Sequence, residues 1–202
     1  TNHADGVRFS TKGAAVIIHD TDLRDAKLIE LQRRGDERGF FARTFCVEEF
    51  AAAGLPVQFV QQNMSFSAQQ GTLRGMHWQK APHGEDKLIR CLSGAIFDVI
   101  LDLRPTSPSF LKWQGFVLND TNKHQVLVPK GFAHGFQTLT PDVEVSYLVS
   151  HPYTPEAEAG MRWDDPAFAI EWPLDPTEVS DKDANWPDAK NFESLYERRA
   201  GA

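Results

Sequence analysis

The sequence predicts an all-β protein, a sandwich or barrel of many short strands with short helices at its periphery. Strand-like segments follow one another at short spacing along the middle of the chain. Turn residues stand between them, among them Gly71, Ser93-Gly94 and Pro141-Asp142. Such regular punctuation is typical of sandwiches and barrels. The expected strands cover residues 57–63, 73–79, 87–92, 95–102, 112–118, 125–128, 132–139 and 143–150.

The segments that flank these strands are less regular. Residues 1–25 are polar and unpatterned and are interpreted as an N-terminal arm or a strand supplied to a neighbour, and residues 26–202 as a single domain. Residues 27–31 have a strand pattern. Residues 47–53 are the clearest helix candidate, because the stop signals Gly54 and Pro56 follow. The region after about residue 153, rich in Pro, Asp and Trp, is expected to form short helices and loops on the barrel.

The composition is that of a globular, acidic protein. Of its 202 residues, 41% are hydrophobic and 11% aromatic, more than a disordered chain carries. The formal net charge of -7 argues against non-specific nucleic-acid binding, which needs a basic surface. Cys46 and Cys91 are too few for a disulfide scaffold and are expected to be free. Neither a signal-peptide pattern nor a bilayer-spanning apolar run is found, so a cytoplasmic protein without a membrane partner is expected.

Two motifs in the middle of the chain resemble the two halves of a cupin barrel. The first is segment 73–79 (LRGMHWQ) and the second is segment 129–135 (PKGFAHG). A metal-binding cupin carries His-x-His and a carboxylate in its first half and one more His in its second. Here Gln79 stands at the second His position, and an amide is a poor ligand for transition metals. The motifs therefore predict a metal-free pocket in which His77 acts as a base.

From the residues alone, His77 has two interpretations. A His beside Trp78 in a strand is often a hydrogen-bonded core residue, but strand alternation places His77 on the face opposite to Trp78. An imidazole works as a base only if a partner fixes its tautomer and stabilises the imidazolium. Asp165 is the candidate partner. Its structural alternative is an Asx turn ahead of Pro166.

Other polar side chains also have a structural and a functional interpretation. Tyr147, in an alternating strand, is either a core tyrosine or a proton donor opposite the His, and Lys87 is either solvated or, pointing inward, an oxyanion stabiliser. Arg38 and Arg74 each precede a Gly, so their guanidinium groups suit a diphosphate, with surface salt bridges as the alternative. Arg74 faces either outward or, through a bulge at the following Gly, into the pocket. His134 is either a pocket residue or structural.

Collinear motifs run through most of the chain, from about Leu28 to Asp183. They are segments 36–41 (DERGFF), 61–65 (QQNMS), 71–79 (GTLRGMHWQ), 87–90 (KLIR), 97–99 (FDV), 104–107 (RPTS), 129–136 (PKGFAHGF) and 161–166 (MRWDDP). Together they resemble the dTDP-4-dehydrorhamnose 3,5-epimerase family. The resemblance implies a jelly-roll cupin homodimer that needs no metal or cofactor. It also implies an epimerase that inverts carbon 3, carbon 5 or both in a nucleotide-linked 4-keto-6-deoxy sugar, by way of an enolate.

The resemblance also implies roles for individual side chains. His77 matches the family's base, Asp165 its paired carboxylate and Tyr147 the acid on the opposite side. Lys87 matches the residue near the 4-keto oxygen. The matches with substrate-binding positions are the diphosphate ligands Arg38 and Arg74, the pocket residues Gln62, Asn63 and His134, and Tyr153, which corresponds to an aromatic that stacks on the nucleotide base.

Two departures from the family pattern bear on which sugar is bound. Leu148 follows the catalytic Tyr where a Lys is common, and Pro152-Tyr153 stands where a Tyr pair is common. Three alternatives stay open. They are an epimerase acting at carbon 3 alone on a related dTDP or GDP sugar, a metal-dependent cupin enzyme, and a binding module that has lost catalysis.

Overall fold

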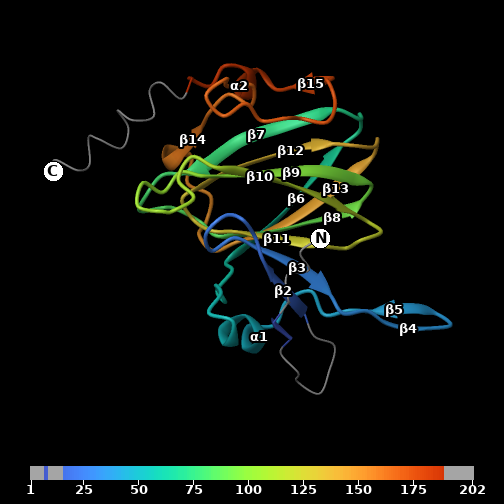
Figure 1. The fold of residues 1–202 in the computed structure, drawn as a ribbon. Helices are drawn as coiled ribbons and strands as arrows, with labels where there is room; N and C mark the ends of the chain where they lie inside the picture. The colour runs from blue at the N-terminus through green and yellow to red at the C-terminus, as the bar shows by residue number, and fades with distance from the viewer. Residues whose placement is uncertain (1–6, 9–15, 189–202) are drawn as a thin grey trace.

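Most of the computed structural model, which describes residues 7–8 and 16–188, consists of β-strands (Figure 1). The helical elements of the described residues are α1 (Val47–Ala52), α2 (Asp181–Ala184) and the 3-10 turn η1 (Pro155–Ala157). The prediction of an all-β protein with short peripheral helices is confirmed. The strands are β1 (Val7–Arg8), β2 (Val16–Asp20), β3 (Lys27–Leu31), β4 (Arg34–Asp36), β5 (Gly39–Phe41), β6 (Gln61–Ser67), β7 (Thr72–Gln79), β8 (Lys87–Ser93), β9 (Ala95–Asp102), β10 (Trp113–Asn119), β11 (Gln125–Val128), β12 (Phe132–Thr138), β13 (Val143–Val149), β14 (Glu158–Gly160) and β15 (Glu178–Val179).

Two sheets pack face to face. The first has the strand order β1-β2-β3-β11-β8-β13-β6, and the second has the order β10-β9-β12-β7-β14, with β15 beside β7. The main core lies between them, where Ile89 and Val145 of the first sheet meet Ile100 and Leu118 of the second, all at most 1% exposed. Because alternate residues of a strand point to opposite faces, each strand sends one set of side chains into this space and the other set outward.

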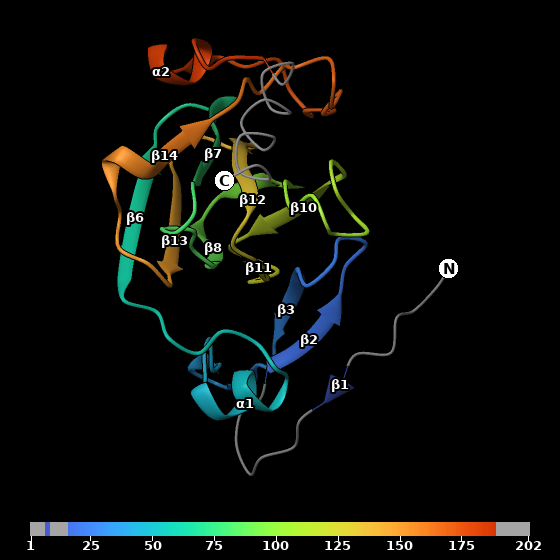
Figure 2. The same cartoon turned by 90° about the vertical axis from the view of Figure 1, so that its left-hand side faces the viewer.

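Helix α1 and the segment after it cover part of the outer face of the first sheet (Figure 2). Phe50 of α1 is fully buried against Leu88 and Leu127. Beside it, the buried carboxylate of Glu49 accepts hydrogen bonds from the Arg43 guanidinium (2.5 Å) and from the backbone N–H of Val16 (3.0 Å). The carboxylate therefore ties the helix to β2.

Two expectations about the first half of the chain need adjustment. The strand expected at residues 57–63 begins at Gln61 and continues to Ser67, because Val57 and Phe59 pack on the α1 side of the sheet. Within the expected N-terminal arm, β2 pairs with β3 of its own chain, while residues 1–6 and 9–15 lie outside the described residues. Cys46 and Cys91 are free, as predicted. Neither helix in the described ranges is long and apolar enough to cross a membrane.

A bulge in β7 shapes the inside of the second sheet. His77 pairs with His134 of β12, but Arg74 pairs with Phe136, so β7 holds one residue more than β12 over this stretch. Gly75 lies in the bulge with a φ of +123°, and a Cβ there would stand only 2.5 Å from the Cα of Gly135. Glycine is therefore required. Of the two orientations open to Arg74, the structure has the one produced by the bulge: Arg74 and His77 line the same cavity.

Candidate functional site

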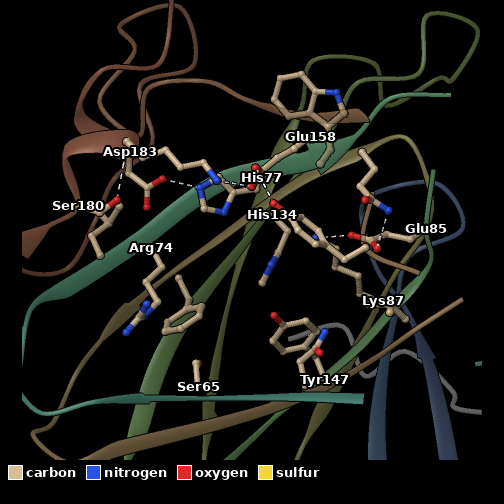
Figure 3. Close-up of a pocket in the computed structure, with 18 of the residues that line it drawn as sticks. Ser65, Arg74, His77, Glu85, Lys87, His134, Tyr147, Glu158, Ser180 and Asp183 are labelled. Carbon is tan, nitrogen blue, oxygen red and sulfur yellow. Dashed lines mark hydrogen bonds and ion pairs between the residues drawn. The ribbon is translucent and has the colours of Figure 1, made fainter. Parts of the chain in front are cut away.

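An open cavity of about 640 Å³ lies between the two sheets. Its walls come from β6, β8 and β13 on one side and from β7 and β12 on the other, and residues of β14, β15 and α2 contribute to its rim (Figure 3). Most of the polar side chains singled out from the sequence lie here. The cavity residues among them are Asn63, Arg74, His77, Lys87, His134, Tyr147 and Tyr153.

A histidine and a carboxylate form the tightest polar contact in this cavity. Nε2 of His77 lies 2.5 Å from Oδ1 of Asp183, at α2. Asp183 also accepts hydrogen bonds from the backbone N–H of Gly75 (3.1 Å) and from the indole of Trp186 (3.3 Å). Burial raises the pKa of Asp183, but the hydrogen bond and charge of His77 and these further donors outweigh it and hold the pKa below its ordinary value.

The charge of Asp183 determines which nitrogen of His77 is basic. An ionised carboxylate can only accept a hydrogen bond, so Nε2 of a neutral His77 carries the proton and Nδ1 keeps its lone pair. The His77 side chain is 31% exposed and that of Asp183 only 5%. The pair is thus an imidazole open to the cavity and backed by a buried carboxylate, the arrangement that a general base requires.

The prediction that Asp165 is the partner of His77 is wrong. Asp165 does not line the cavity, and its Oδ1 accepts a hydrogen bond from the N–H of Ala167 (2.8 Å), two residues ahead and across Pro166. This is the Asx turn that the sequence left as the alternative. Asp183 was missed because a carboxylate 106 residues from its imidazole gives no local signal; Ser180, which caps α2 by accepting from the N–H of Asp183 (3.1 Å), marks only a helix start.

A second imidazole lies beside the first. His134 is the direct cross-strand neighbour of His77, and its Nε2 lies 2.7 Å from Oδ1 of Asp98. Asp98 is fully buried, and its Oδ2 has no hydrogen-bond partner among the described residues. The cavity floor therefore presents two adjacent imidazoles (Figure 3), and each is held by a carboxylate, His77 by Asp183 and His134 by Asp98.

The opposite wall presents an ammonium group and a phenol. Lys87 points into the cavity, where Nζ lies 3.2 Å from Oε1 of Glu85 and both side chains are nearly buried. Tyr147, on β13 of the facing sheet, lies across the cavity from His77 and His134 (Figure 3). Burial raises the pKa of Tyr147, and the charge of Glu85 adds to this, against a hydrogen bond from Asn63 and the charge of Arg74. The phenol is therefore protonated at neutral pH.

Two of the residues expected to bind the substrate do not line the cavity of the chain to which they belong. Gln62 points to the other face of β6 because neighbouring residues in a strand alternate, and its amide donates to the hydroxyl of Ser146 (3.0 Å). Arg38 lies on the β4–β5 hairpin, which projects from the body of the molecule (Figure 1). Its side chain is 89% exposed and contacts only Asp36 among the described residues.

Arg74 and Tyr153 lie at the mouth of the cavity. The guanidinium of Arg74 donates to the hydroxyl of Ser67 (3.1 Å) and to the carbonyl of Phe66 (3.0 Å), which leaves part of its fork open to a ligand. The exposed Tyr153 donates from its hydroxyl to Glu158 (3.0 Å). Further cavity residues that the sequence reasoning missed are Glu85, Glu158, Ser180 and Lys182.

Gln79 stands at the position where a metal-binding cupin has its second His, and its amide makes hydrogen bonds within the protein. Its amide nitrogen donates to the carbonyl of His83 (3.0 Å) and to Oε2 of Glu85 (3.1 Å), and its oxygen accepts from the N–H of Thr154 (2.6 Å). In the described part of the chain, no group of three or more His, Cys, Asp and Glu side chains is placed to hold a metal ion.

The two-sheet barrel and its histidine–carboxylate cavity are those of a cupin-like jelly-roll enzyme. Residues 20–191 match the family model described as dTDP-4-dehydrorhamnose 3,5-epimerase. The chain belongs to this family, which is a family of isomerases, and the resemblance seen in the sequence is confirmed.

Individual relatives agree with this assignment. A dTDP-4-dehydrorhamnose 3,5-epimerase of Sinorhizobium fredii is 45% identical over 166 residues, 82% of this chain and 85% of the relative. A crystal structure of the same enzyme from Bacillus anthracis, with TDP and PPi bound, superposes with a TM-score of 0.84 at 45% identity and covers 86% of this chain and 99% of that one. A dTDP-4-dehydrorhamnose 3-epimerase of Streptomyces niveus is 37% identical over 153 residues, which are 75% of this chain and 73% of the relative.

Proposed function

We propose that this protein inverts carbons 3 and 5 of a dTDP-linked 4-keto-6-deoxy sugar, converting dTDP-4-dehydro-6-deoxyglucose to dTDP-4-dehydrorhamnose. The observation that carries the proposal is the cavity in which His77, backed by Asp183, faces Tyr147 across the space beside Lys87. The family membership and the names of the relatives support the substrate class. Both carbons flank the same carbonyl, so one cavity serves both inversions.

The first step is proton abstraction. His77 takes the proton of carbon 3 or carbon 5 on Nδ1, because Nε2 is committed to Asp183 at 2.5 Å. The electron pair of the C–H bond moves toward the carbonyl, and the 4-keto oxygen becomes an enolate oxygen. Asp183 stabilises the imidazolium that forms and keeps the ring in one orientation.

The second requirement is stabilisation of the enolate. The ammonium group of Lys87 points into the cavity and faces the carbonyl oxygen of the bound sugar. Removal of an oxyanion donor in other enzymes costs about 3 kcal/mol of transition-state stabilisation. His134, beside His77, contributes a further hydrogen bond to the sugar.

The third step returns a proton to the other face of the planar enolate. Tyr147 belongs to the sheet opposite His77, and its raised pKa keeps the proton on the phenol until the enolate forms. Donation from this side inverts the carbon, whereas return of a proton by His77 restores the original configuration. Inversion thus needs both walls of the cavity, and exchange with solvent needs only one.

The nucleotide occupies the mouth of the cavity in this proposal. Arg74 binds the diphosphate, Asn63 contributes a polar contact in the pocket, and Tyr153 at the exposed rim stacks on the base. The open fork of Arg74 supports the first of these roles.

Arg38 lies outside the cavity of its own chain, and we therefore propose a homodimer in which it reaches the diphosphate bound to the partner. The β4–β5 hairpin that carries it also exposes Phe40 and Phe41, 50% and 66% accessible. The edge strand β6 lines the cavity with one face and exposes Met64 and Phe66 on the other. A partner's hairpin over β6 would bury these apolar side chains and bring its Arg38 to the cavity mouth.

Incubation with dTDP-4-dehydro-6-deoxyglucose in heavy water tests the proposed function. Deuterium is expected at carbons 3 and 5 of the product, and the His77→Ala variant should incorporate none. Label at carbon 3 alone would favour the 3-epimerase reaction, for which the Streptomyces niveus relative is the supporting observation. Absence of label with the intact protein, or exchange at the native rate in His77→Ala, would overturn the proposal.

A further inference from the structure

One charged side chain inside the cavity has no part in the steps above. Glu85, just before β8, is 11% exposed at its side chain and lines the cavity between two polar groups. Its Oε1 lies 3.2 Å from Nζ of Lys87, and its Oε2 accepts a hydrogen bond from the amide of Gln79 (3.1 Å). Figure 3 shows this carboxylate on the same wall as Lys87 and above Tyr147.

The position of Glu85 is fixed by the backbone around it. Gln79 itself is 5% exposed and bonded to Thr154 N–H and to the carbonyls of His83 and Pro152, so it presents its amide to Glu85 in one orientation. Because its hydrogen bond to Gln79 fixes the carboxylate of Glu85, the ion pair persists only while Lys87 keeps its position. The ion pair therefore keeps the ammonium of Lys87 inside the cavity instead of in the solvent at its mouth.

The same carboxylate acts on the phenol opposite. The titratable and charged groups that face Tyr147 are Glu85 and Lys87 from the β8 wall, Arg74 and His77 from β7, and His134 from β12. Burial is the largest cause of the raised pKa of Tyr147, and the charge of Glu85 raises this pKa further, while the charge of Arg74 lowers it. A phenolate beside a carboxylate is disfavoured, so Glu85 keeps the proton on Tyr147.

We propose, on the basis of the function proposed above, that Glu85 is a positioning residue for the epimerisation: it holds Lys87 at the enolate oxygen and places a negative charge on the wall that faces the phenol of Tyr147. One residue thereby coordinates the group that stabilises the enolate with the group that protonates it. Because Glu85 acts through Lys87 and Tyr147, it need not contact the sugar itself.

The Glu85→Gln variant removes the charge and keeps an oxygen that can accept from Gln79. We expect kcat for inversion to fall about tenfold with little change in KM, less than the hundredfold or more that follows loss of an oxyanion donor itself. The alkaline limb of the inversion profile should move to lower pH, since Tyr147 then ionises more readily. In the Tyr147→Phe background the same substitution should leave the alkaline limb of deuterium exchange in place.

Two further variants separate charge from position. Glu85→Asp keeps the charge but draws it back by one methylene, so the pH profile should stay close to that of the native protein while kcat falls. Glu171→Gln removes a charge at an exposed residue away from the cavity and should change neither. Thermal unfolding of each variant establishes that it is folded.

A readout without turnover separates this inference from the function on which it rests. The chain has three tyrosines, so ring-labelled tyrosine gives few NMR signals. The signal that disappears in Tyr147→Phe belongs to Tyr147. Its titration should move to lower pH in Glu85→Gln whether or not any sugar reacts. An unchanged titration and an unchanged kcat would overturn the inference. Failure of the native protein to exchange deuterium, with the titration shift present, would overturn only the proposed reaction.

Discussion

Asp183 holds the Nε2 atom of His77 at 2.5 Å across a separation of 106 residues. The contact joins the middle of β7 to a four-residue helix near the end of the described chain. Because the same carboxylate also accepts from the N–H of Gly75, it binds both the bulge of β7 and the imidazole that follows it. The orientation and the tautomer of His77 therefore depend on the docking of α2.

Asp183→Asn is expected to lower the rate of deuterium exchange about 100-fold, because an amide stabilises an imidazolium poorly and can favour the other tautomer. Asp165→Asn is the matched control, since it changes a carboxylate to an amide in the Asx turn. It should leave the exchange rate within about twofold and cost about 1 kcal/mol of the free energy of unfolding. Comparable loss of exchange in both variants would contradict the assignment of Asp183.

The stability of the protein should depend on Asp183 at acid pH. The folded pKa of this carboxyl lies below its ordinary value of 3.8, so the native state binds fewer protons than the unfolded chain as the pH falls. The resulting stabilisation is complete above the unfolded pKa and is lost as the pH falls through the lowered folded pKa. Urea unfolding at a series of pH values should therefore show the gap between native protein and Asp183→Asn narrowing below about pH 4. A gap that stays constant would contradict the pairing.

Tyr147→Phe should separate exchange from inversion. The variant keeps the ring in the cavity wall and removes the proton that the raised pKa retains on the phenol. We expect the inversion rate to fall about 100-fold while exchange falls much less, because a general acid typically contributes a factor of this order. NMR of the deuterated sugar measures both. Equal losses would indicate that one group performs both proton transfers.

Mixed dimers test the proposed contribution of Arg38. Arg38→Ala and His77→Ala homodimers should each be weakly active, the first through a raised KM and the second through loss of the base. After mixing and reassociation, a heterodimer has one site with both native residues if Arg38 reaches across the interface. Activity should then recover to about one quarter of the native value, the statistical share of such sites. No recovery, with mixed dimers verified by mass spectrometry, would place Arg38 elsewhere.

The face of β6 that points away from the cavity should matter for assembly. Met64→Asp and Phe66→Asp place charges among the exposed apolar residues of this strand. We expect each variant to be monomeric, or to dissociate at about tenfold higher concentration, because an unpaired buried charge disfavours association. Val117→Asp changes another exposed apolar residue, on β10 in the other sheet, and is the control. Analytical ultracentrifugation measures the effect, and a native protein that is itself monomeric would contradict the proposed dimer.

Local sequence patterns predict the secondary structure well for strands that pair in a sheet over their whole length. Segment 95–102 was expected as a strand and is β9 with the same bounds, since Ser93-Gly94 turns the chain before it. Segment 57–63 was misplaced because Val57 and Phe59 are as apolar as strand residues but are buried under α1 without strand pairing. Apolar character alone does not distinguish these two forms of burial.

The sequence by itself determined the fold class, the family and the position of His77, Lys87 and Tyr147 on strands, because these follow from local periodicity and from short motifs. Only the tertiary structure decided which carboxylate meets His77, that Gln62 turns away from the cavity, and that Arg38 lies on a hairpin outside it. Those outcomes depend on strand register and on how distant segments dock. The sequence separation of Asp183 from His77 leaves no local trace of their contact, which forms only when α2 packs against β7.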